Sequence, residues 1–113
     1  MVVKKLRPEG VVHVNKERLD QLYAQLGATS ADGVVSRAME ELAVRLAKVE
    51  SCYKKGQLEE MQKAARSMIA ISEQIGMETF ASVATDVNKL ATLDDGTALA
   101  ATVDRLMRIG ENS

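Results

Sequence analysis

Hydrophobic residues recur at steps of three and four along most of this chain, which is the spacing of one face of an α-helix. The clearest series in the segment 77–90 consists of Phe80, Val83, Val87 and Leu90. A second series follows the break TLDDGT and consists of Leu99, Val103, Leu106 and Ile109. Only the short stretch VVHV at 11–14 shows the alternation and β-branching of an extended segment. The pattern therefore predicts a chain built almost entirely from helices.

Polar and glycine residues divide this pattern into segments. Asn15 is a favourable N-cap for a short first helix that reaches about Leu26 and ends at Gly27. Thr29 with Asp32 resembles a capping box, which predicts that a long second helix begins there. The second helix has an apolar stripe that consists of Val35, Ala38, Leu42, Leu46, Val49 and Cys52. It ends at KKG, where lysines favour the carbonyl end of a helix and glycine can take the left-handed cap.

The third helix is expected from about Gln57 to Ile75, with Gly76 as its end. A helix turns about 100° per residue, so two groups of its side chains point in opposite directions. The inward group consists of Met61, Ala64, Met68, Ile71 and Ile75. The outward group consists of Gln62, Arg66, Ile69, Ala70 and Glu73. A fourth helix starts near Met77, and either Asp94 or Asp95 can cap a fifth.

Four long amphipathic helices with connections of a few residues are best arranged as an antiparallel up-down bundle. We therefore predict an all-α fold: a four-helix bundle with the short additional N-terminal helix across one end. Residues 1–10 are expected to form a flexible arm, and residues 11–113 a single domain, because one core is all that this length supports.

Charge and composition exclude several classes of function. Fifteen basic residues are interspersed with sixteen acidic ones, so no concentrated basic surface for nucleic acid is expected. No segment approaches the roughly 20 apolar residues of a membrane span, and no secretory signal is apparent, so a cytoplasmic location is the expectation. Cys52 is interpreted as a small core residue. With one cysteine and one histidine, His13, neither a metal site nor another cofactor is predicted.

The run AARSMIAISEQIGMETFASVATDVNKL at 64–90, with the order of elements around it, resembles the histidine phosphotransfer (HPt) domain family. The third helix of that family has the pattern A-H-x-L-K-G-x-x-x-x-(I/L)-G. Aligned on Ile75 and Gly76, Ala65 matches the alanine of the pattern and Met68 its leucine. VVHVNKERLDQLYAQLG resembles the family's first segment and helix, so the resemblance covers roughly residues 11–110. It implies a helical bundle in bacterial two-component signalling.

The three positions that carry the family's chemistry differ in this chain. Arg66 stands at the position of the phosphorylated histidine, Ile69 at that of the lysine and Ala70 at that of the glycine. A guanidinium remains protonated and has no free nucleophilic lone pair, so it cannot accept a phosphoryl group as an imidazole does. We therefore expect no phosphotransfer at this position and no enzymatic activity.

The resemblance then implies a binding module that docks a receiver domain or a histidine kinase without accepting phosphate. The surface expected to bind consists of Gln62, Lys63, Arg66, Ile69, Ala70 and Glu73. Arg66 can form a charge-assisted, bidentate bond with an acidic pocket. Two alternatives remain open. One is a structural or adaptor bundle, which could form a homodimer through Ile69; the other is a phosphocarrier that uses His13.

Overall fold

The computed structural model describes residues 14–93 and 95–111. This part of the chain forms five helices: α1 (Lys16–Leu26), α2 (Ala28–Lys55), α3 (Leu58–Gln74), α4 (Glu78–Leu90) and α5 (Gly96–Glu111). The one β-type pairing in these ranges is an isolated antiparallel bridge between Val14 and Met77. The predicted all-α class is confirmed, and each helix lies within a few residues of its predicted position.

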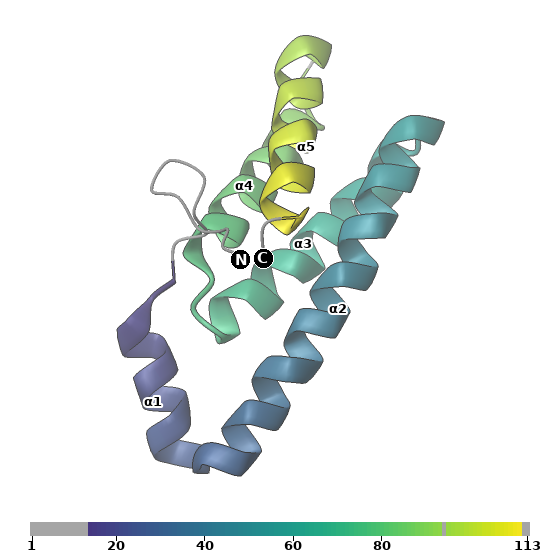
Figure 1. Ribbon diagram of the computed structural model, residues 1–113. Helices are drawn as coiled ribbons and strands as arrows, with labels where there is room; N and C mark the ends of the chain where they lie inside the picture. Colours follow the sequence, from purple (N-terminus) through teal and green to yellow (C-terminus); the bar gives the residue numbers. More distant parts are fainter. Residues whose placement is uncertain (1–13, 94, 112–113) are drawn as a thin grey trace.

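The helices α2 to α5 pack in a ring. α2 packs against α3, α3 against α4, α4 against α5, and α5 returns to α2. The chain reverses direction at each short connection between them, while α1 diverges from the start of α2 (Figure 1). At 1.5 Å per residue the 28 residues of α2 extend about 42 Å, close to the 45 Å longest dimension of the molecule. α2 therefore extends over nearly the whole length of the molecule.

Side-chain and glycine caps fix several helix ends. The Asn15 side chain accepts a hydrogen bond from the Arg18 backbone N–H at 3.0 Å, which confirms the predicted N-cap of α1. Gly56 takes the left-handed conformation (φ +75°) after Lys55, as the KKG run predicts. Asp95 caps α5 through the backbone N–H of Ala98 at 3.0 Å. Asp95, one of the two aspartates predicted as possible caps, therefore caps this helix.

The predicted start of the second helix is wrong. α2 begins at Ala28 with Gly27 as its N-cap, and no side chain caps it. Thr29 and Asp32 therefore lie within the first turns of α2, not at its boundary. Asp32 instead accepts a hydrogen bond from the hydroxyl of Tyr23, which joins α1 to α2 at 2.5 Å. A contact to another helix thus replaced the local cap that the sequence pattern suggested.

The core contains most of the predicted apolar positions. All four residues of the α5 series, Leu99, Val103, Leu106 and Ile109, are buried. The inward group of α3 is buried except for Ile71, which is half-buried and packs against the core. Ala65 and Ser72 are also fully buried on α3, so its inward face is wider than the spacing indicated. The extra width faces α4, against which α3 packs.

The predicted flexible arm at 1–10 and His13 lie outside the described residues. Within the ranges 14–93 and 95–111, no helix is both long enough and apolar enough to cross a membrane.

Candidate functional site

The outward residues of α3 form the surface that the sequence predicts as a binding site, and we call it the α3 surface. Its members are Gln62, Lys63, Arg66, Ile69, Ala70 and Glu73. Lys63, Arg66, Ala70 and Glu73 are exposed, whereas Gln62 and Ile69 are half-buried. The helical spacing is therefore correct in placing the Arg66 guanidinium outside the core. The helical spacing is less accurate for the two half-buried side chains, Gln62 and Ile69, which lie at the border with α4.

Asn88 on α4 joins two members of this surface. Its side-chain oxygen accepts a hydrogen bond from Arg66 Nη1 at 3.4 Å, and its backbone oxygen accepts one from Gln62 Nε2 at 3.1 Å. The first bond is long and exposed, so it orients the guanidinium at a small energetic gain. Most of the N–H donors of Arg66 remain available to a ligand.

Ile69 departs from its expected place at the exposed centre of the surface. It is half-buried and packs against the hydrophobic core. The reason is its angular position on α3, on the same side as Ala65 and Gln62, where α4 covers the helix. Ala70 is the exposed small residue nearest the centre. The apolar part of the α3 surface is accordingly smaller than predicted, which leaves less area for self-association through Ile69.

Lys63 faces the opposite border, toward α2. It forms an ion pair with Glu60 at 3.3 Å. Beside it, Arg45 of α2 reaches across to α3 and donates a hydrogen bond from Nε to Ser67 Oγ at 2.5 Å. The two borders of the α3 surface therefore differ, with amides on the α4 side and cations on the α2 side.

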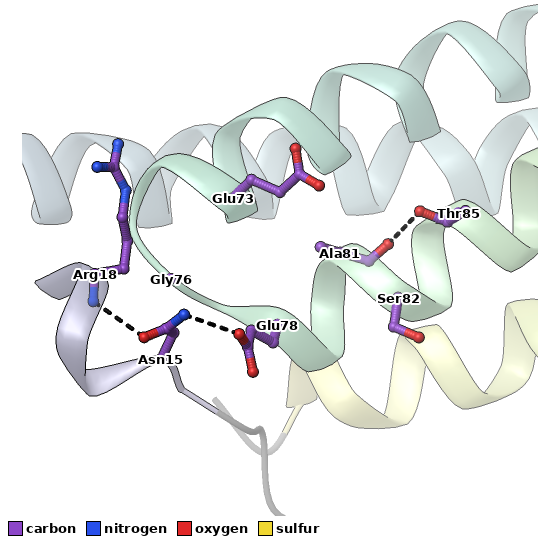
Figure 2. Close-up of a pocket in the computed structure, with 8 residues that line it drawn as sticks. All are labelled: Asn15, Arg18, Glu73, Gly76, Glu78, Ala81, Ser82 and Thr85. Carbon is purple, nitrogen blue, oxygen red and sulfur yellow. Dashed lines mark hydrogen bonds between the residues drawn. The ribbon is translucent and has the colours of Figure 1, made fainter.

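Glu73 lines a pocket of about 380 Å³ between the start of α1 and the α3–α4 turn. Figure 2 shows Asn15 at its edge, between Arg18 and Glu78. Asn15 Nδ2 donates to Glu78 Oε2 at 3.0 Å, and Arg18 Nε donates to the Gln74 carbonyl oxygen at 3.1 Å. These bonds hold α1 on the turn. Three polar side chains of this pocket, those of Asn15, Arg18 and Glu78, are thus engaged in joining structural elements.

Among the described residues, no group of three or more His, Cys, Asp or Glu side chains is arranged to hold a metal ion. Cys52 is buried in the core, as expected. Ser67 Oγ accepts a hydrogen bond from Arg45, and the Thr85 hydroxyl donates one to the Ala81 carbonyl oxygen. His13, the phosphoacceptor of the alternative hypothesis, lies outside the described residues.

Two features of the site were missed from the sequence: Asn88, and the pair Arg45–Ser67. In both cases the bonded residues lie on different helices and are far apart along the chain. Asn88 lies one residue after Val87 of the apolar series on α4, so its place at the border of that series could have drawn attention to it. Arg45 is a polar residue at the border of the α2 stripe, and Lys and Arg at such borders often extend across to a neighbouring helix.

Comparisons with family models, with curated proteins and with solved structures found no match to this chain.

Proposed function

We propose that this chain is a non-catalytic, HPt-like docking module of a two-component phosphorelay. In this proposal it binds a receiver domain or a histidine kinase through the α3 surface and accepts no phosphoryl group. The observation that carries the proposal is the exposed position of Arg66 on the outer face of α3. That is the position at which the resembled family displays its histidine.

The packing of the helices supports the architecture that the proposal requires. The ring of α2, α3, α4 and α5, with reversals at short connections, is compatible with an antiparallel up-down four-helix bundle. In this proposal α1 corresponds to the short additional helix. Its start is joined to the α3–α4 turn by the contacts of Asn15 and Arg18.

The properties of Arg66 fit recognition without transfer. A guanidinium can form two parallel hydrogen bonds with one carboxylate, and it keeps its charge at physiological pH. A receiver domain presents acidic side chains around its phosphorylation site, so the resemblance provides a matching group. Ala70 adds one methyl group where the family has glycine, and it is exposed. Close approach of a partner backbone to this point of α3 therefore remains feasible.

The direct test is calorimetric titration of the purified protein with purified receiver domains and kinases from the same genome. Arg66→Ala should weaken binding about tenfold or more, because it leaves a desolvated acidic group of the partner without its counter-charge. Arg66→Lys should retain part of the affinity, since it keeps the charge and loses the planar fork. Arg105→Ala, on α5, is the matched control and should leave the affinity unchanged.

Failure of all receivers and kinases to bind, or unchanged affinity in Arg66→Ala, would remove this proposal. The homodimeric adaptor would be favoured instead by a mass that rises with protein concentration and falls to that of a monomer in Ile69→Glu.

A further inference from the structure

We infer that the groove between α2 and α3 is a second docking surface, which takes a carboxylate-bearing segment of the protein partner. This inference adds a second contact surface to the proposed function. It rests on the proposed function only for the identity of the partner. The groove has a volume of about 400 Å³. Six of its lining residues carry the argument: Val44, Arg45, Lys48, Glu60, Lys63 and Ser67.

Cationic side chains predominate in the lining of the groove. Arg45, Lys48 and Lys63 bring three positive charges to the groove, and Glu60 brings one negative charge. The groove is therefore positive on a chain whose formal net charge is −1. Glu60 is already paired with Lys63, and neither Arg45 nor Lys48 has a carboxylate within 4.0 Å among the described residues. Cations that lack an internal partner are free to attract an acidic one.

The Arg45 side chain is held in place by hydrogen bonds before any ligand binds. Its Nε donates to Ser67 Oγ on α3, and its Nη1 donates to the Glu41 carbonyl oxygen at 3.2 Å. These two bonds hold the guanidinium of the half-buried Arg45 in place, and its remaining N–H donors take part in neither bond. A side chain that is already ordered loses little conformational entropy when a ligand binds. Arg45 is thus a fixed anion-binding group in the groove, in contrast to a mobile surface lysine.

The surroundings of the groove also favour an acidic partner at this place. Val44, at the rim, is 66% exposed and offers an apolar contact beside the cations. Arg66 precedes Ser67 directly and points toward Asn88 on the other border of α3. At the far end of that border, the pocket in Figure 2 carries two carboxylates, Glu73 and Glu78, against one guanidinium, Arg18, so its net charge is negative. An acidic partner that covers Arg66 is therefore attracted toward α2 and away from that pocket.

The test uses a probe that does not depend on the identity of the partner. A short oligoglutamate peptide is titrated into the 15N-labelled full chain, and the backbone amide shifts are followed. Shifts should concentrate at the groove, on residues 44–48 and 63–67. Lys48→Glu should weaken the apparent affinity about fivefold. Arg105→Glu, which makes the same change in charge on α5, should leave the affinity within about twofold.

Lys48 is exposed, so its replacement is not expected to disturb folding. Lys48→Gln provides a second variant, with a smaller loss of affinity in the same direction. Shifts spread over all exposed basic residues, or equal losses in Lys48→Glu and Arg105→Glu, would overturn the groove as a specific surface.

A second measurement separates this inference from the proposed function. If a receiver domain binds and requires Arg66 but responds equally to Lys48→Glu and Arg105→Glu, the groove is not used and the proposed function stands. If no receiver or kinase binds while oligoglutamate binding still depends on Lys48, the signalling proposal fails and the groove is supported as a surface for another acidic protein.

Discussion

A β-carbon built on Gly76 would lie 2.8 Å from the backbone carbonyl oxygen of Asn15. The same two residues are joined by a hydrogen bond from the Asn15 N–H to the Gly76 carbonyl oxygen at 2.6 Å. The start of α1 therefore rests directly on the α3–α4 turn, with no room for a side chain between them. Gly76 also has a φ of +75°, a conformation that other residues adopt at a cost.

This contact makes Gly76→Ala a strongly destabilising substitution. Alanine should cost about 1 kcal/mol for the positive φ and, in total, about 3 kcal/mol, because the Asn15 backbone must move. Gly56→Ala is the matched control, with the same φ of +75° and no atom within 4 Å of the added carbon. It should cost only about 1 kcal/mol. Urea denaturation of both variants measures the difference, and equal losses would contradict a steric role for the Asn15–Gly76 contact.

Ser72 is fully buried, and its hydroxyl has no hydrogen-bond partner among the described residues. A buried hydroxyl without a partner carries a desolvation cost, so Ser72→Ala should leave the free energy of unfolding unchanged or raise it by about 1 kcal/mol. Ser67→Ala should have the opposite sign, with a loss of about 1 kcal/mol, because it removes the acceptor of the Arg45 bond. Thermal denaturation of the two variants tests this contrast. A loss in Ser72→Ala comparable to that in Ser67→Ala would show that the hydroxyl is satisfied in solution.

The hydrogen bond to Asp32 raises the pKa of Tyr23 above its ordinary value of 10.0, with smaller contributions from desolvation and from the charge of Asp32. A tyrosine whose pKa is higher in the folded than in the unfolded chain stabilises the fold in its protonated form. This stabilisation is complete below pH 10.0 and is lost as the pH rises through the folded-state pKa.

Unfolding experiments at alkaline pH should therefore show a shallower loss of stability in Tyr23→Phe than in the wild type. Tyr53→Phe on α2 is the control for loss of a phenol group, and it should retain the wild-type slope above pH 10.0 because Tyr23 is intact. Identical slopes in Tyr23→Phe and the wild type would exclude a contribution of the Tyr23–Asp32 bond.

The proposed function also predicts how the chain responds to a phosphorylated receiver domain. The wild type should acquire no phosphoryl group at α3, because the guanidinium of Arg66 is not nucleophilic. Arg66→His places an imidazole at the same exposed position, so it should gain a label that is stable in alkali and labile in acid. Arg66→Gln is the control and should remain unlabelled. A label on α3 of the wild type, or none on Arg66→His with a receiver that binds it, would contradict the role proposed for position 66.

Much of the α3 surface could be predicted because it depends on local geometry. Arg66 and Ala70 are exposed since they lie opposite Met61 and Met68 on the same helix, and the angle between them follows from helical spacing alone. Ile69 could not be placed in this way. Its half-burial depends on how far α4 covers the border of α3, which is a property of two helices together.

Local sequence determined the helices of this protein and most of their ends. Apolar spacing predicted the buried series on α5, and Asn15, Gly56 and Asp95 marked boundaries through hydrogen bonds or dihedral angles within a few residues. The tertiary structure alone decided the bond of Tyr23 to Asp32, the pairing of Arg45 with Ser67, and the contact of Asn15 with Gly76. Each of these depends on groups brought together from separate helices, whose relative positions are fixed by the packing of the whole core.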